Sequence, residues 1–255
     1  MNTEKWDDYY ACLATQNTSL GHDFSVTPEA IQAAESSSLS LECKLCLSPQ
    51  ETTKLDSVQW YWAGHQNTKL EPIEYGENIL ISPIDKALQM YNLHEKHTGQ
   101  YICRMGQAEA PPYFLTVVAS LDEDLNEVHS AEAPSGPYAQ QPEEINGYNL
   151  IVDTEWTPWT SCSKCNQIGR RHRFGYCIVK YKKKHGRHVR NNNGTSENIK
   201  TPTVQIPKEH YELLQIFKFG IPCSSHILPR SLKKINEVVN RKNEIMSGYC
   251  KGLKQ

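Results

Sequence analysis

The sequence lacks any long apolar run. No stretch approaches the roughly 18 uncharged apolar residues that a membrane-spanning helix needs, so we expect no membrane span in this chain. The first residues, MNTEKWDDYYACLATQ, lack the basic segment and apolar core of a secretory signal peptide, which by itself favours the cytosol. Hydrophobic residues make up 38% of the 255, which favours compact modules over one large core.

The common catalytic motifs are also missing. There is no GxSxG, HExxH, P-loop or glycine fingerprint for a dinucleotide. The ten histidines are scattered, and His94 and His97 are typical of loop residues rather than metal ligands. The sequence therefore predicts no enzyme, no catalytic residue, no cofactor and no bound metal.

Cysteine, in contrast, is plentiful and spread along the chain. The nine cysteines are Cys12, Cys43, Cys46, Cys103, Cys162, Cys165, Cys177, Cys223 and Cys250. This usage is typical of oxidised, secreted proteins. Two N-glycosylation sequons, at Asn17 and Asn193, suit the same compartment. We therefore expect an extracellular or membrane-attached ectodomain whose signal peptide and anchor are not present in this chain.

Residues 24–118 have the pattern of an all-β sandwich. In SLSLECKLC, Leu39, Leu41 and Cys43 alternate with polar residues, as in a half-buried strand. Further short strand patterns follow in VQWYW, ALQMYNL, GQYICRM and YFLTVV, with turn residues between them.

The ordered set Cys43, Trp60 and Cys103, with HTGQYIC before the last, resembles the V-type immunoglobulin domain. The resemblance implies a Cys43–Cys103 bridge, Trp60 packed against it, and Tyr101 as the tyrosine-corner residue. His97 stands where the family usually has Asp, so the usual Asp–Arg pair is not expected.

Cys46 lies three residues after Cys43, so its side chain points to the opposite face of a regular strand and cannot share the core bridge. The nearest unassigned cysteine is Cys12, in an N-terminal segment of residues 1–23. We predict a Cys12–Cys46 bond; the alternative is a free, buried Cys46.

The chain then changes its charge abruptly. Residues 119–148 hold seven acidic residues and no Lys or Arg, which predicts an acidic linker. Residues 149–255 form a module rich in Cys, Trp and Arg, and its 168–190 stretch is basic with no acidic residue. We hypothesise that the linker folds back on this basic face.

The stretch EWTPWTSCSKC, residues 155–165, contains a CxxC pair that allows three chemistries. A redox pair needs a flanking strand and helix, which the sequence does not suggest. A zinc site needs four ligands, and the usual second close pair is absent; the candidates would be Cys162, Cys165, Cys177 and one of His172, His185 or Cys223.

WTPWTSC followed by GRRHRFGYC resembles a short thrombospondin type-1 repeat. The resemblance implies that Trp156 and Trp159 stack with Arg171 and Arg173 by cation–π contact, within a disulfide framework. It also implies Trp156 as a site of C-mannosylation, whereas Lys164 replaces the fucosylated Ser or Thr.

The LxCxxC, GxYxC, EWTPW, CSKC, RFGYC and PRSLKK elements in this order resemble the family with sequence similarity 187, over residues 12–250. That resemblance implies immunoglobulin-like V-type proteins of the secretory pathway, usually membrane-attached. It implies no established biochemical activity.

The pairing of the five C-terminal cysteines stays open, because an odd number of cysteines leaves one without a disulfide partner in this module. We expect Cys162 and Cys165 not to bond each other, because a CxxC bridge is short and strained. The leftover thiol would pair beyond this chain.

The run KYKKKHGRHVR suits a sulfated glycosaminoglycan or another polyanion, and a solvated basic loop is the alternative. Its candidate contacts are Lys180, Lys182, Lys183, Lys184, Arg187 and Arg190.

The segment 211–220 is expected to be a short helix or strand, and residues 231–245 to be a C-terminal amphipathic helix. The predicted fold is therefore mainly β: a V-type sandwich, a linker, and a small disulfide-rich module with that helix.

The predicted function is noncatalytic recognition or adhesion with an unidentified protein partner at a cell surface or in the matrix. The alternative is an intracellular zinc-binding protein with a basic segment that contacts nucleic acid.

Overall fold

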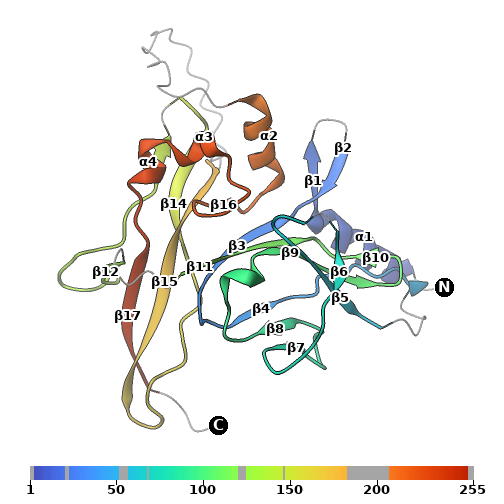
Figure 1. Ribbon diagram of the computed structural model, residues 1–255, viewed down its shortest axis with the longest axis horizontal. Helices are drawn as coiled ribbons and strands as arrows, with labels where there is room; N and C mark the ends of the chain where they lie inside the picture. Colours follow the sequence, from blue (N-terminus) through green and yellow to red (C-terminus); the bar gives the residue numbers. More distant parts are fainter. Residues whose placement is uncertain are drawn as a thin grey trace. The chain divides into compact units, whose positions relative to one another are not determined.

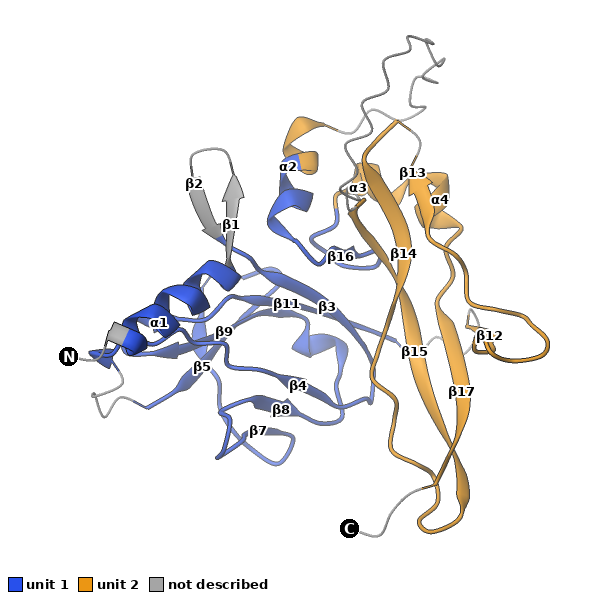
Figure 2. Cartoon of the chain, turned by 180° about the vertical axis from the view of Figure 1, so that it is seen from behind, with its two compact units in different colours: residues 1–122, 212–228 blue, residues 123–211, 229–255 orange. Residues whose placement is uncertain are grey.

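A computed structural model of the chain describes residues 3–20, 23–51, 57–67, 69–119, 125–145, 147–182 and 207–251. The chain divides into two compact units (Figures 1 and 2). Unit 1 comprises residues 1–122 and 212–228, and unit 2 comprises residues 123–211 and 229–255. Within the described ranges, no helix is both long enough and apolar enough to cross a membrane.

Unit 1 contains two facing sheets. One has the order β3-β11-β9-β5-β6 and the other β4-β8-β7, with β10 paired to β9. Their strands are β3 (Glu29–Ala34), β4 (Leu39–Leu41), β5 (Gln59–Gly64), β6 (Glu71–Pro72), β7 (Ile79–Ile81), β8 (Leu88–Met90), β9 (Gly99–Met105), β10 (Ala108–Glu109) and β11 (Tyr113–Val118). Helix α1 (Thr3–Gln16), the hairpin β1 (Asn17–Leu20) and β2 (Asp23–Val26), and the short helix η2 (Glu95–His97) complete its N-terminal part.

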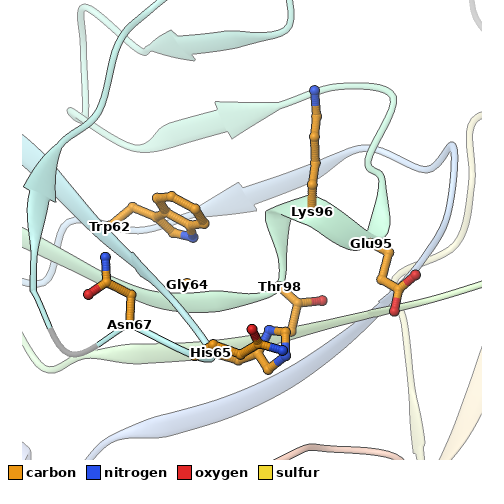
Figure 3. A pocket seen from close by; sticks show the side chains of 8 residues that line it. Trp62, Gly64, His65, Asn67, Glu95, Lys96 and Thr98 are labelled. Atoms are coloured by element: carbon orange, nitrogen blue, oxygen red, sulfur yellow. The ribbon is translucent and has the colours of Figure 1, made fainter.

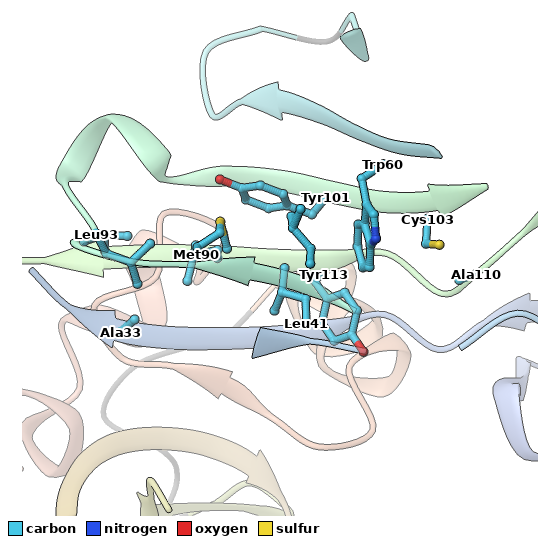
Figure 4. Close-up of a cluster of buried hydrophobic side chains, with 12 residues drawn as sticks. Ala33, Leu41, Trp60, Met90, Leu93, Tyr101, Cys103, Ala110 and Tyr113 are labelled. Atoms are coloured by element: carbon cyan, nitrogen blue, oxygen red, sulfur yellow. The ribbon is translucent and has the colours of Figure 1, made fainter. Parts of the chain in front are cut away.

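The core of unit 1 has the immunoglobulin signature. Cys43 and Cys103 form a disulfide, and the side chain of Trp60 is fully buried in the same cluster (Figure 4). The Tyr101 hydroxyl donates a hydrogen bond of 2.6 Å to the carbonyl oxygen of His97, which is a tyrosine corner. The mainly β, immunoglobulin-like sandwich predicted from the sequence is confirmed.

Unit 2 is built on one long sheet of order β12-β17-β15-β14-β13. The strands are β12 (Asn126–Val128), β13 (Glu143–Ile145), β14 (Leu150–Trp156), β15 (Ile168–Tyr181) and β17 (Glu244–Lys251). Helices α3 (Arg230–Lys233) and α4 (Asn236–Val239) belong to this unit. Helix α2 (Lys208–Ile216) spans the boundary at residue 211, and β16 (Ile221–Pro222) belongs to unit 1.

The segment 119–148 differs from the extended linker that its composition predicts. Its residues 126–128 and 143–145 form β12 and β13, which pair with β17 and β14. The physical reason is that two apolar side chains, Val128 and Ile145, are buried in the sheet. Two buried apolar residues in an acidic segment leave little trace in the overall composition.

The single helix expected over residues 231–245 is also not formed. The chain makes the two short helices α3 and α4, and β17 begins at Glu244. Ile235, between the two helices, has extended backbone angles. The buried residues Leu232, Ile235 and Val238 give the helical spacing, but β17 gains ladder hydrogen bonds along β15 that a helix would forgo.

Candidate functional site

Two tryptophans and two arginines of unit 2 form an alternating stack. The guanidinium carbon of Arg173 lies 4.7 Å from the Trp156 ring centroid and 4.8 Å from that of Trp159. The guanidinium carbon of Arg171 lies 4.7 Å from the Trp159 ring centroid. Each contact is within the range of a cation–π interaction, so the stack orders Trp156, Arg173, Trp159 and Arg171.

Backbone pairing explains how tryptophans three apart meet arginines two apart. Side chains on a regular strand repeat every two residues, so Arg171 and Arg173 share one face of β15. The tryptophan segment pairs with β15 in steps of three. The backbone N–H of Thr157, Thr160 and Ser163 donates, at 2.8, 2.8 and 2.9 Å, to the carbonyl oxygens of Phe174, His172 and Arg170, respectively.

The hydroxyls of these three residues complete the pairing. The hydroxyls of Thr157, Thr160 and Ser163 accept hydrogen bonds of 2.9 Å from the backbone N–H of Phe174, His172 and Arg170. Each hydroxyl thus replaces a backbone carbonyl as the hydrogen-bond acceptor in the ladder. In this way the tryptophan segment, which pairs at every third residue, stays in register with β15, which pairs at every second residue.

Glycines make room for the stack. A Cβ on Gly175 would lie 2.4 Å from the Thr154 Cγ2 atom and 3.1 Å from the Trp156 ring. A Cβ on Gly248 would lie 3.1 Å from the Trp159 ring. Both positions therefore favour glycine for steric reasons.

A disulfide closes the end of the stack. Cys162 bonds Cys250, and Cys177 and Cys223 are also disulfide-bonded. Cys165 is the free cysteine of the chain and is exposed. The alternative zinc site through Cys162, Cys165 and Cys177 is therefore not favoured, because thiols held in disulfides supply no thiolate ligands. The described residues contain no cluster of three or more His, Cys, Asp or Glu with metal-binding geometry.

In unit 1, Cys12 forms a disulfide with Cys46, which ties α1 to the segment after β4. The Gln16 side chain adds a hydrogen bond of 2.5 Å to the Lys44 carbonyl oxygen. Cys43 and Cys46 lie beyond the end of β4 at Leu41. The Leu45 N–H donates a hydrogen bond of 3.0 Å to the Cys43 carbonyl oxygen, so a tight turn rather than regular strand separates the two cysteines.

The predicted polyanion site is described only at its start. Lys180 pairs with Asp153 at 2.6 Å, and Lys182 pairs with Glu144. Both cations are therefore partly neutralised by acidic side chains of the same unit, one of them from the acidic 119–148 segment. Lys183, Lys184, Arg187 and Arg190 lie outside the described residues, as do Asn193 and the side chain of Asn17.

The outer face of the larger unit 1 sheet is covered in part by the returning segment 212–228. Phe217 packs edge-on against Phe114 of β11, with ring centroids 5.5 Å apart. The Thr116 hydroxyl donates a hydrogen bond of 3.1 Å to the hydroxyl of Ser225, which is fully buried. Ser224 hydrogen-bonds Gln32 of β3. Sequence reasoning missed this contact, because the segment is far away in the chain.

The β5–β9 part of the same sheet presents a different group of side chains. The guanidinium carbon of Arg104 lies 5.0 Å from the ring centroid of Tyr61. The same guanidinium forms an ion pair of 2.7 Å with Glu109 of β10. An aromatic ring and an acidic side chain thus hold Arg104 in one orientation.

A separate hollow of about 440 Å³ in unit 1 is lined by Trp62, Gly64, His65, Gln66, Asn67, Glu95, Lys96 and Thr98 (Figure 3). The Trp62 Nε1 atom is buried and has no hydrogen-bond partner in the described structure. Gly99 is required here, since a Cβ would lie 2.2 Å from the Ala63 carbonyl oxygen.

Burial shifts two titratable groups near the tyrosine corner. It lowers the pKa of His97, and the positive charge of Lys96 and neighbouring His94 lower it further. Burial raises the pKa of Tyr101 well above its usual value, so its hydroxyl stays protonated and donates to His97.

Comparison with known proteins finds only weak structural likeness. No family model matches the chain, so the resemblances to family 187 and to the thrombospondin type-1 repeat remain predictions. The four N-terminal immunoglobulin domains of Dscam1 isoform 8.4 align with 14% identity and a TM-score of 0.31, covering 63% of this chain and 42% of that one.

The extracellular domain of the voltage-gated sodium channel beta4 subunit aligns with 21% identity and a TM-score of 0.30, covering 42% of this chain and 98% of that one. Drosophila semaphorin 2a aligns with 20% identity and a TM-score of 0.30 over 36% of this chain, which spans 14% of the semaphorin chain. The immunoglobulin-like assignment rests on the chain's own disulfide, Trp60 and tyrosine corner.

Proposed function

We propose that this protein is a noncatalytic, extracellular recognition protein that contacts a protein partner through the outer face of β5, β9 and β10. The observation that carries the proposal is the ordered group formed by Tyr61, Arg104 and Glu109 on that face. The disulfides support an oxidising compartment, where immunoglobulin-like sandwiches commonly serve recognition.

Physical chemistry favours this group as an anchor. Arginine and tyrosine are enriched among residues that dominate binding energy at protein interfaces. A guanidinium that a ring and a carboxylate already hold in place loses little conformational entropy when a partner binds. The entropic cost of ordering Arg104 at the interface is therefore small. Segment 212–228 already covers the β3–β11 part of the face, which leaves the β5–β9 part for a partner.

The test uses the intact chain as a fluorescent tetramer on a panel of cell lines. We expect saturable binding to a subset of lines, and a loss of at least about tenfold in affinity for Tyr61→Ser and Arg104→Ala, as for interface anchors. Lys69→Ala is the matched control, since Lys69 lies in an exposed ion pair in the same unit. Binding that survives both anchor substitutions, or no binding to any line, rejects the proposal.

The same proposal includes polyanion contact through the basic run at 180–190. The charge of the run supports it, whereas the ion pairs of Lys180 and Lys182 weaken it. A heparin column tests this part separately, because elution at or below physiological salt rejects it.

A further inference from the structure

We propose that the open edge of β17, at residues 247–251, receives an extended acidic segment of a partner protein as an added β-strand. The surface lies on unit 2 and is separate from the recognition face proposed for unit 1. Three independent observations on the described residues carry it: a strand edge with no partner among them, two exposed apolar side chains, and two cations that form no ion pair with an acidic side chain among them.

The edge follows from the strand pairing. β17 pairs with the first half of β15 along the whole length of β17, from Glu244 opposite Gly175 to Lys251 opposite Ile168. On the other side, β12 pairs only with residues 244–246. Among the described residues, 247–251 therefore has a strand neighbour on one side only, as the positions of β12, β17 and β15 in Figure 2 illustrate. Alternate residues of such an edge direct backbone N–H and C=O groups outward, ready to pair with another chain.

Apolar side chains stand exposed at the same place. Tyr249 is 75% exposed and Ile168 is 72% exposed, which is unusual for neighbouring large apolar residues on a folded domain. They line a hollow of about 470 Å³ together with Cys250 and Lys251. Ile168, Tyr249 and Lys251 lie on the face opposite the tryptophan–arginine stack, so a partner that contacts these three side chains would leave the stack undisturbed.

The charge of the surface selects the partner. Arg170 is opposite Tyr249 and Lys251 is opposite Ile168 in the strand register, so both cations share the face with the apolar pair. Both are exposed, and neither forms an ion pair within the described part of the chain. The acidic residue on β12, Glu127, is opposite Ile245, four residues before Tyr249.

This arrangement disfavours a second copy of the chain as the occupant. Pairing of two β17 edges would gather two copies each of Arg170 and Lys251 on one face, and like charges at that range repel. Positively charged side chains are a common protection of sheet edges against self-association. An acidic strand removes the repulsion and makes the same edge favourable.

The mode of binding fixes the spacing of the ligand. In strand addition, main-chain hydrogen bonds supply affinity and alternate side chains supply specificity. The ligand would therefore place an apolar side chain beside Tyr249 and acidic side chains two residues away on the same face, one of them beside Lys251.

The test is a titration of the full chain, labelled with ¹⁵N, with the capped peptide Thr-Glu-Thr-Phe-Thr-Glu-Thr. We expect the largest amide shifts at residues 247–251. Tyr249→Ser should weaken binding about threefold to fivefold, as for one cross-strand pair, and Lys251→Glu should weaken it by at least as much. Lys242→Glu makes the same charge change at an exposed position of unit 2 away from the edge, and should leave binding unchanged.

Control peptides separate the contributions. Replacing Phe by Ser should weaken binding, replacing both Glu by Lys should abolish it, and replacing the two inner Thr by Pro should abolish it through lost backbone donors. The proposal is overturned if no amide of 247–251 shifts at millimolar peptide, or if the Lys or Pro peptides bind equally well. It is also overturned if only a heparin oligosaccharide shifts these amides, or if they shift with protein concentration alone.

Discussion

At the scale of single residues, His97 shows how a departure from a family pattern is accommodated. Its Nδ1 atom accepts the backbone N–H of His94 at 3.0 Å, so that nitrogen carries no proton. Its carbonyl oxygen accepts the Tyr101 hydroxyl. A neutral His97 thus holds together the turn on which the tyrosine corner depends, and no Asp–Arg pair is needed there.

This role predicts a pH-dependent stability. The folded state lowers the pKa of His97 below its ordinary value of 6.5, so the unfolded chain takes up the proton more readily. The contribution of neutral His97 to the free energy of unfolding is fully present above about pH 6.5 and is lost as the pH falls through the pKa of His97 in the folded state. His97→Asn keeps an acceptor but does not titrate, so its free energy of unfolding should fall less between pH 7.5 and 5.

Urea unfolding of both proteins, followed by tryptophan fluorescence at several pH values, measures the difference. The other histidines titrate in both proteins and cancel in the comparison. Parallel stability curves for the wild type and His97→Asn would contradict the role given to this residue.

At the scale of elements, β15 pairs with three segments of unit 2. Its second half pairs with β14, and its first half pairs with β17 on one side and with the tryptophan segment on the other. The change of partner falls at Gly175, which is buried against Thr154 and Trp156. A strand of 14 residues thus positions the whole stack.

Gly175→Ala should therefore destabilise unit 2. The new methyl group would overlap the Thr154 side chain and press on the Trp156 ring, and overpacking of this kind costs about 1–3 kcal/mol. We expect a matching loss of near-UV circular dichroism as the Trp156–Arg173 contact loosens. The control is Gly76→Ala, where the added Cβ has no atom within 4 Å. Equal stability of the two variants would show that the stack tolerates displacement.

At the scale of the whole molecule, disulfides connect parts that are distant in sequence. The Cys43–Cys103 and Cys162–Cys250 bonds join residues 60 and 88 positions apart. On the chain-entropy estimate, loops of this length each stabilise the fold by about 4 kcal/mol. The exposed Cys165 is the exception.

Thiol counting tests this scheme. In denaturant without reductant, iodoacetamide should modify one cysteine per chain, Cys165, and after reduction it should modify all nine. A zinc chelator should change neither the count nor the stability, because the disulfide-bonded sulfurs are not available as ligands. Labelling of two or more cysteines before reduction would refute the pairing.

The sequence by itself determined the features whose causes are local or carried by a motif. Strand alternation and the Cys43, Trp60, Cys103 order led to the sandwich, and the three-residue offset of Cys46 led to Cys12 as its partner. The resemblance of WTPWTSC and GRRHRFGYC to a thrombospondin type-1 repeat led to the stack of Trp156 and Trp159 with Arg171 and Arg173. The two-residue spacing of the arginines placed both on one face of a strand.

Only the tertiary structure decided which distant segments meet. No local signal in the sequence indicates the return of residues 212–228 to the unit 1 sheet or the entry of β12 and β13 into the unit 2 sheet. The same holds for the end of β12, after which residues 247–251 have no described neighbour on the side away from β15. The same limit explains the helix wrongly expected over 231–245. Apolar spacing there is compatible with a helix, but the hydrogen bonds offered by β15 exist only once the chain has folded.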